Sequence, residues 1–382
     1  MTRLSVAASA LVLAAGPAAA QTPPCGATIT ADITLAADMT CAGTALVIGA
    51  DGITLDLGGY TLTGAGVTGS AGVANTGWRD GVITNGTIAG FFFGIHFEGA
   101  SNNVIRGVTA EGNVLSGMYL EEGSDDNRIE SSAVINNGTP VYRGNGITIN
   151  SSDGNTVTRT LATGNQTQGI FVGGGAGTAA SANTRIRHNT SYGNVSNGIG
   201  ILGGSGHVVA ENESTGNGGH GISFSSTPAA GRVTDSVIAG NVAAGNTLNG
   251  IALNDAHGNR LTGNDVSGNV LTGILLTGAD GNSVVANRAG GNLVHGLLVR
   301  AGADRNSFSG NAFDGNGSRG ISVGPGGGPA PAGNTFTGNR AEDNAGLFDV
   351  QDQTLGDGTA GTDSTYRGTR CETSNPPGIC KP

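Results

Sequence analysis

The chain has 382 residues, of which 71 are glycine, 12% are charged and 4% are aromatic. Its formal net charge of −10 at pH 7 argues against nucleic acid and anionic lipid as partners, because an acidic surface repels both. Such a composition would indicate disorder in an aperiodic chain, but the apolar residues here recur at regular intervals and can form a core.

The first twenty residues have the pattern of a secretory signal peptide. Arg3 supplies a short basic start, residues 4–15 are apolar, and residues 18–20 are three alanines suited to cleavage. The apolar stretch is too short to span a bilayer, and no later segment is longer. We therefore expect cleavage after Ala20, a secreted or periplasmic protein, and no insertion into a membrane.

Four cysteines lie near the two ends of the mature chain, Cys25 and Cys41 at one end and Cys371 and Cys380 at the other. Export permits disulfides, and four cysteines allow three connectivities. We expect local pairing, Cys25 with Cys41 and Cys371 with Cys380, because a repeat array separates the two pairs. The predicted organisation is a signal peptide (1–20), an N-terminal cap (21–44), the repeats (45–350) and a C-terminal cap or tail (351–382).

A Gly-Ile pair followed by alternating apolar residues recurs along the repeats at steps of 23 to 29 residues. The pairs, with close variants, begin at Gly94, Gly117, Gly146, Gly169, Gly198, Gly221, Gly250, Gly273, Gly296, Gly320 and Gly346. A fixed period of this size indicates stacked units, none of which can bury its apolar face alone.

Each repeat contains two further short strands, one of the form Asn-x-apolar and one of the form Asn-x-small, as at Asn259 and Asn264. A Gly-Asn pair, such as Gly245-Asn246, precedes the Gly-Ile strand and suits a tight corner, since Gly adopts positive φ freely. Stacked asparagines are expected to form amide ladders. The alternative is that these asparagines bind sugars.

Three strands per repeat joined by short corners predict an all-β fold. It is a single-stranded, right-handed parallel β-helix of about a dozen coils with caps at both ends. On these motifs, residues 27–350 resemble the right-handed β-helix repeat proteins of the pectate-lyase-like superfamily, including its NosD-like, carbohydrate-binding branch. The resemblance implies lyases, hydrolases, epimerases, adhesins or non-enzymes, because this fold carries many functions.

Departures from the repeat are the places where function is expected, because stacking does not explain them. Two residues past the glycine, the outward column begins with His96, Tyr119, Thr148 and Phe171. Four residues past it, the column begins with Glu98, Glu121 and Asn150. An insertion carrying Tyr142 and Arg143 precedes one Gly-Ile strand, and further insertions follow the strands at residues 173–182, 225–232 and 324–333.

This cluster suits proton abstraction from a sugar carbon, with His96, Tyr119, Glu121 and Arg143 as catalytic residues. The residues expected to bind substrate are Glu98, Asn150, Tyr142 and Phe171. The face resembles that of mannuronan epimerases, although of their Asp-Pro-His motif only His96 has a counterpart. The alternatives are a solvated strand face on a non-catalytic scaffold or adhesin, and a NosD-like, metal-related periplasmic protein.

Other site types are less well supported by the sequence. The segment 219–223, Gly-His-Gly-Ile-Ser, resembles the polygalacturonase histidine motif, but the aspartates and the Arg-Ile-Lys of that family are absent, so this hydrolase is rejected. Single corner aspartates such as Asp125 and Asp153 give only weak grounds for Ca²⁺, and no other cofactor or metal is expected. We expect a monomer whose partner is a polysaccharide or cell-surface glycan.

Overall fold

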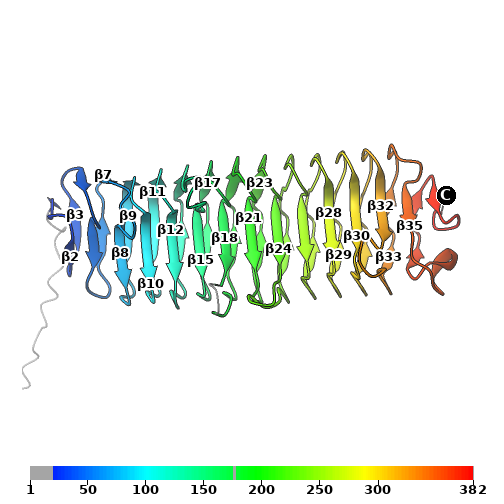
Figure 1. Cartoon of the computed structure of the whole chain (residues 1–382), viewed down its shortest axis with the longest axis horizontal. Coiled ribbons are helices and arrows are strands. Elements are labelled where there is room, and N and C mark those ends of the chain that lie inside the picture. The colour runs from blue at the N-terminus through cyan, green and yellow to red at the C-terminus, as the bar shows by residue number, and fades with distance from the viewer. Residues whose placement is uncertain (1–19, 175–177, 382) are drawn as a thin grey trace, which may run out of the picture.

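The computed structural model describes residues 20–174 and 178–381, so the predicted signal peptide lies outside the described residues except for Ala20. The chain forms a long rod of stacked coils, with the two ends of the described chain at opposite ends of the rod (Figure 1). Nearly all of its regular structure is β-strand, and every pairing between named strands is parallel. The predicted parallel β-helix is therefore confirmed.

The Gly-Ile strands form one 15-stranded sheet, here called sheet B. Its strands are β2 (Ala27–Ile29), β5 (Leu46–Ile48), β8 (Ala71–Thr76), β10 (Phe93–Glu98), β12 (Ser116–Glu121), β15 (Ile147–Asn150), β18 (Ile170–Gly173), β21 (Ile199–Leu202), β24 (Ile222–Ser225), β26 (Ile251–Asn254), β28 (Thr272–Thr277), β30 (His295–Arg300), β32 (Arg319–Gly324), β35 (Val350–Asp352) and β38 (Ser374–Asn375).

The remaining strands form a 21-stranded sheet, here called sheet A, and a two-stranded pair. Sheet A contains β1 (Ala20–Gln21), β3 (Ile33–Leu35), β4 (Met39–Cys41), β6 (Thr54–Asp56), β7 (Thr61–Gly64), β9 (Val82–Ala89), β11 (Val104–Glu111), β13 (Arg128–Glu130), β14 (Ala133–Ile135), β16 (Thr156–Thr158), β17 (Leu161–Thr163), β19 (Arg185–Arg187), β20 (Thr190–Tyr192), β22 (Val208–Ala210), β23 (Glu213–Thr215), β25 (Val237–Ala239), β27 (Arg260–Thr262), β29 (Ser283–Val285), β31 (Ser307–Ser309), β33 (Thr335–Thr337) and β36 (Thr365–Arg367). The pair is β34 (Arg340–Ala341) with β37 (Arg370–Cys371), and a short 3₁₀ turn spans Thr359–Gly361.

The glycine of each Gly-Ile pair is required for space inside the coil. At Gly94 an added Cβ would lie 2.3 Å from the carbonyl oxygen of Gly117, and at Gly273 it would lie 2.8 Å from that of Gly296. The following isoleucines, such as Ile95, are fully buried. The repeating pair therefore marks where one coil packs directly on the next.

The predicted asparagine ladders are present in three buried columns, and the corner glycine Gly245 has a φ of 65°. Within one column, Asn241 Nδ2 donates to Asn264 Oδ1 at 2.9 Å, and Asn264 Nδ2 donates to Asn287 Oδ1 at 2.9 Å. The columns include Asn103, Asn127, Asn155, Asn259, Asn282, Asn306 and Asn334; Asn189, Asn212, Asn241, Asn264, Asn287, Asn311 and Asn339; and Asn113, Asn137, Asn165, Asn194, Asn217, Asn246, Asn269, Asn292 and Asn316. Buried amides with partners above and below stabilise the stack and are not available to a ligand.

Both ends of the rod are tied by disulfides. Cys25 is bonded to Cys41 and Cys371 to Cys380, which confirms the local pairing. Near the C-terminal end the core contains a stack of rings, in which Phe336 lies 4.6 Å from Phe308 and 4.5 Å from Tyr366 between ring centroids. Within the described ranges, no helix is long and apolar enough to cross a membrane.

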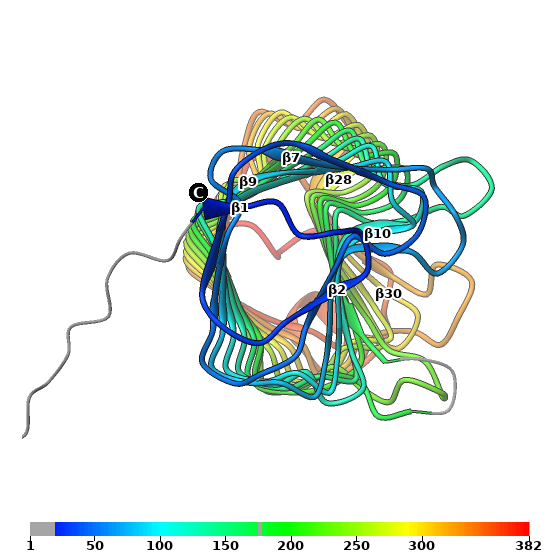
Figure 2. The same cartoon turned by 90° about the vertical axis from the view of Figure 1, so that its left-hand side faces the viewer.

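The predicted insertions all lie beside sheet B. Seen along the rod, the coils superpose closely, while the larger loops project outward on the side where β10 and β30 are labelled (Figure 2). These loops precede β15 or follow β18, β24 and β32. The projecting loops therefore border the outward face of sheet B, and the candidate site lies on this face.

Candidate functional site

The strand register places the predicted outward columns on neighbouring coils. His96 is paired with Tyr119 and Glu98 with Glu121, both between β10 and β12. Tyr119 is in turn paired with Thr148 on β15. Parallel strands lie about 4.8 Å apart, so these side chains are within reach of one another.

The central contact joins His96 to Glu121 across two coils. His96 Nε2 lies 2.8 Å from Glu121 Oε1, and the two side chains are 20% and 27% exposed. The contact is diagonal: Glu121 is two residues beyond the direct partner of His96. Glu98, the direct neighbour of Glu121, remains exposed at the edge and makes no ion pair among the described residues.

Aromatic rings enclose this pair. Phe93 stacks on His96 with ring centroids 4.4 Å apart and an interplanar angle of 19°, and the ring of Tyr119 lies 5.8 Å from that of His96. Phe92 makes an edge contact with Tyr142 at 5.0 Å, which attaches the 138–144 insertion to the site. Such contacts fix the orientation of the imidazole and remove water from one side of it.

Sequence reasoning missed Phe92 and Phe93. Simple alternation puts Phe93 and His96 on opposite faces of a strand, because they are three residues apart. In the structure Gly94 and Ile95 both face the interior, so alternation is interrupted and both flanking side chains face outward. The run of three phenylalanines at 91–93 directly before a Gly-Ile pair was the available signal.

Tyr119 is held as a neutral phenol. Burial raises its pKa, and the nearby Glu121 carboxylate raises it further, because both oppose a second negative charge. Asn150 Nδ2 lies 3.1 Å from the phenol oxygen and fixes its position. The site therefore combines a proton donor, Tyr119, with a histidine–carboxylate pair in which the ring can take up a proton.

Arg143 lies on the insertion at the margin of this group. Its side chain is exposed and forms no ion pair with the described residues, while its backbone carbonyl accepts a hydrogen bond from the Thr167 hydroxyl. The structure thus brings together His96, Tyr119, Glu121, Asn150 and Tyr142, with Arg143 and Glu98 at the edges.

Phe171 belongs to an adjoining hollow further along the same face. Phe171 is paired with Thr148 on one side and Gly200 on the other. The hollow has a volume of about 160 Å³ and is lined by Gln168, Phe171, Asn197, Gly200, Ile201, Leu202, Ser223 and Ser225. Amide, hydroxyl and aromatic groups of this kind suit a sugar ring, and the Gln168 amide occupies the space that a side chain at Gly200 would take.

Two other histidines contact carboxylates, and they show that the ring contacts distinguish this site. His188 Nδ1 lies 3.1 Å from Glu211 Oε2, but those side chains are 52% and 58% exposed. His257 is 15% exposed and lies between two carboxylates: its Nε2 is 2.9 Å from Asp255 Oδ1 and its Nδ1 is 3.8 Å from Asp280 Oδ2. Neither histidine has a ring contact in the described chain, whereas His96 has two.

The predicted corner aspartates have structural partners. Asp125 Oδ1 accepts the backbone N–H of Asp153 at 2.7 Å, and Asp153 Oδ1 accepts that of Ala182 at 2.7 Å, so each connects one coil to the next. Across residues 20–174 and 178–381, no group of three or more His, Cys, Asp or Glu side chains is placed so that it could hold a metal ion.

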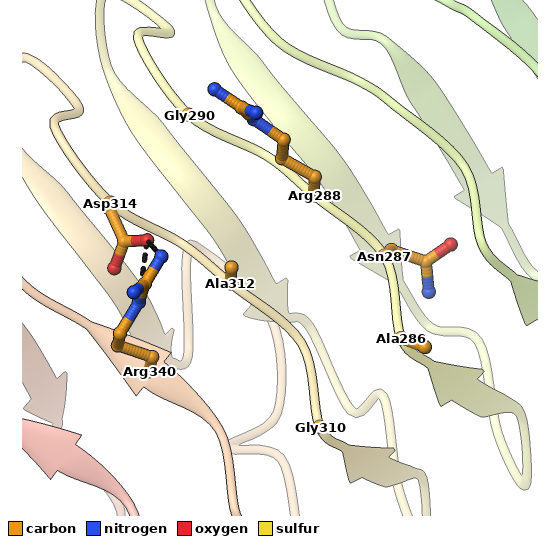
Figure 3. Close-up of a pocket in the computed structure, with 8 residues that line it drawn as sticks. All are labelled: Ala286, Asn287, Arg288, Gly290, Gly310, Ala312, Asp314 and Arg340. Carbon is orange, nitrogen blue, oxygen red and sulfur yellow. Dashed lines mark hydrogen bonds and ion pairs between the residues drawn. The ribbon is translucent and has the colours of Figure 1, made fainter.

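A second hollow of about 320 Å³ lies near the C-terminal end of the rod, bordered by Arg288, Ala312, Asp314 and Arg340. Asp314 Oδ2 accepts a hydrogen bond from Arg340 Nε at 2.9 Å, and Arg288 extends away on the other side (Figure 3). Asp314 and Arg340 satisfy each other, and neither histidine nor tyrosine is among the residues that line this hollow, so this region is a weaker candidate than the face around His96.

Comparisons with known proteins agree with this architecture. No curated protein sequence matches the chain. Among solved structures, the Azotobacter vinelandii mannuronan C-5 epimerase AlgE6 A-module is similar with a TM-score of 0.61 and 16% identity, covering 90% of this chain and 91% of that one. The periplasmic alginate epimerase AlgG is similar with a TM-score of 0.54 and 16% identity, covering 91% and 78%.

At these identities the likeness concerns the fold. The Dettilon tailspike protein shares it too, with a TM-score of 0.50 and 16% identity over 90% of this chain and 61% of that one. The family model described as right handed beta helix region matches residues 44–184 and 177–354, which is most of the chain. The chain therefore belongs to the right-handed β-helix family.

Proposed function

We propose that this protein binds a polysaccharide on the outward face of sheet B and modifies it by abstracting a proton from a sugar carbon, as a lyase or an epimerase does. The observation that supports this most directly is the 2.8 Å contact between His96 and Glu121 beneath Phe93, with the neutral phenol of Tyr119 alongside. Two of the structurally similar proteins are named as polysaccharide epimerases, which agrees with the proposal.

In this proposal His96 is the base and Glu121 positions it. When Nε2–H donates to Glu121, Nδ1 keeps its lone pair, and the carboxylate stabilises the imidazolium that forms on proton uptake. Tyr119 returns a proton to the opposite face of the sugar carbon, which inverts that carbon. If the glycosidic C–O bond breaks instead, the same carbanion gives elimination, with Tyr119 protonating the leaving oxygen.

The remaining predicted residues bind substrate in this proposal. Arg143 neutralises the sugar carboxylate, whose charge increases as the proton leaves. Tyr142 and Asn150 flank the reacting sugar, and Glu98 contacts its hydroxyls. Phe171, in the adjoining hollow, stacks on a neighbouring sugar of the same chain. The disulfides and the signal-like N-terminus support a secreted or periplasmic location, where such polymers occur.

The test measures turnover on a panel of acidic and neutral polysaccharides, following both unsaturated products by ultraviolet absorbance and sugar stereochemistry by NMR. We expect Glu121→Gln, His96→Ala and Tyr119→Phe each to lower kcat by about 10²- to 10⁴-fold, because each removes an acid–base function or its positioning. Thermal unfolding should remain near that of the wild type, since these side chains are outside the core.

Glu211→Gln is the matched control. It removes the carboxylate of another histidine–glutamate pair, at 3.1 Å, without touching the candidate site, and it should leave turnover unchanged. Equal activity of the Glu121→Gln variant and the wild type would overturn the proposal. Polysaccharide binding with no turnover on any polymer would support the non-catalytic scaffold instead.

A further inference from the structure

Five arginines gather on the outward side of sheet A, on the coils that also carry the candidate site. They lie on or beside four successive strands: Arg106 on β11, Arg128 on β13, Arg159 after β16, and Arg185 and Arg187 on β19. This face is separated from sheet B by the corner at residues 99–103. On a chain with 18 Lys and Arg in total and a net charge of −10, such a concentration of positive charge is local and requires an explanation.

Three of these arginines surround one glutamate. Arg106 Nε, Arg128 Nη2 and Arg159 Nη2 lie 2.5, 3.1 and 3.8 Å from the carboxylate of Glu130, whose side chain is 5% exposed. Burial opposes the charge on Glu130, but the hydrogen bonds and charges of Arg106 and Arg128 outweigh it and lower its pKa. Glu130 therefore stays ionised and holds the arginines in place while neutralising only one of them.

The other two arginines have no partner of this kind. Arg185 and Arg187 are exposed, and neither makes an ion pair or a side-chain hydrogen bond with any described residue. In register, Thr156 separates Arg128 from Arg185, and Thr158 separates Glu130 from Arg187. Between β13 and β19, about 10 Å apart, β16 thus presents two threonine hydroxyls, and Arg159 follows directly after them.

We infer that this surface is a second binding site, for a polysaccharide that carries carboxylates, and that it holds the polymer beside the candidate site on the neighbouring face. The five arginines and Glu130 leave four uncompensated positive charges. Guanidinium groups bind carboxylates through paired hydrogen bonds, and the threonine hydroxyls supply partners for sugar hydroxyls. The inference rests on the proposed function for one point, that the ligand is a polysaccharide. None of the arginines on this surface is among the proposed catalytic residues.

A carboxylated glycan suits this surface better than a nucleic acid does. The positive area is short: on the next coil Glu211 pairs with His188, and β23 begins with Glu213. A nucleic acid, whose charges are dense and continuous, would be repelled by these acidic borders and by the rest of the rod. A polymer with one carboxylate per sugar can place its charges on the arginines and its uncharged atoms elsewhere.

The experiment measures binding of alginate, dextran and a single-stranded DNA oligonucleotide to the full mature chain, at several salt concentrations. The test variant is Arg185→Gln/Arg187→Gln, because neither residue supports a described contact. The matched control is Arg260→Gln/Arg288→Gln, which changes the net charge equally on coils outside the cluster. A third variant, Glu121→Gln, disables the candidate site alone.

We expect alginate to bind with a marked salt dependence and dextran not to bind. Arg185→Gln/Arg187→Gln should weaken alginate binding about tenfold, the control less than twofold, and Glu121→Gln not at all. Turnover of a short oligosaccharide should survive in the arginine variant, so failure of this inference is distinguishable from failure of the proposed function. Equal weakening in the two double variants, absence of alginate binding, or tighter binding of DNA than of alginate would overturn the inference.

Discussion

Two parts of the same rod, the coils from 93 to 173 and those from 250 to 324, use one backbone plan for different surfaces. In both, the Gly-Ile strands of sheet B stack in register over buried isoleucines. The outward column reads His96, Tyr119, Thr148 and Phe171 in the first part. It reads Ala252, Leu275, Leu298 and Ser322 in the second.

The difference shows which residues the fold requires. Inward glycines, a buried apolar residue after each of them and two of the three asparagine columns occur in both parts, because every coil must pack on the next. Outward residues are free of that requirement, so a half-buried histidine–carboxylate pair with aromatic walls is not a consequence of stacking. The first part therefore combines the common scaffold with chemistry, and the second part is largely scaffold.

The largest effect is expected from breaking the scaffold in the regular part. Asn264→Ala removes the side chain that accepts from Asn241 and donates to both Asn287 and the carbonyl of Ile238. Leaving these buried groups unpaired should cost about 3–5 kcal/mol of stability. Chemical denaturation checks this, with Ser307→Ala, an exposed outward position, as control. A loss as small as that of the control would mean that the ladder does not stabilise the rod.

A smaller effect is expected at the interruption of the ladder between the two parts, where His207 stands in an asparagine column. Its Nε2 contacts the carbonyl of Gly203 at 3.3 Å, its Nδ1 has no hydrogen-bond partner among the described residues, and burial lowers its pKa to about 4. Histidine in the unfolded chain takes up a proton near pH 6.5, so His207 should by itself lower stability by about 3 kcal/mol as the pH decreases from about 6.5 to 4.

The check is a pair of denaturation series at several pH values, on the wild type and on His207→Asn. The variant replaces the titrating ring by asparagine, the residue that the ladder otherwise uses. Between about pH 6.5 and 4 it should therefore lose about 3 kcal/mol less stability than the wild type. Comparing each protein with itself at neutral pH removes the effect of any packing change. The same acid sensitivity in both proteins would contradict the assignment.

The smallest effect is expected from the surface column itself. Phe171→Ala should raise KM about threefold to tenfold at unchanged kcat, because a stacking contact outside the reacting centre contributes to binding only. Leu298→Ala, at the equivalent position in the second part, is the control and should leave both constants unchanged. Kinetics on the polysaccharide identified by the panel provide the measurement. An equal change in KM for Phe171→Ala and Leu298→Ala would mean that the first part of the rod does not bind substrate differently from the second.

The columns of the site could be predicted from the repeat, but its contacts could not. Spacing alone placed His96 beside Tyr119 and Glu98 beside Glu121, because register follows from stacking identical coils. The hydrogen bond instead joins His96 to Glu121, since the longer diagonal is bridged by two flexible side chains. Phe93 was missed because two successive residues, Gly94 and Ile95, face inward and interrupt the alternation.

The amino-acid sequence by itself determined the β-helix, the asparagine ladders and the disulfide pairs, because these follow from a period and from the ends of an array. Only the tertiary structure decided which exposed residues meet. Glu130 gathers arginines from three successive coils, and Tyr142 reaches Phe92 from an insertion. Such contacts depend on side-chain direction and loop path, which no repeat specifies. The repeat period determines how the coils stack, whereas the side-chain contacts of the folded protein determine what its outward faces can bind.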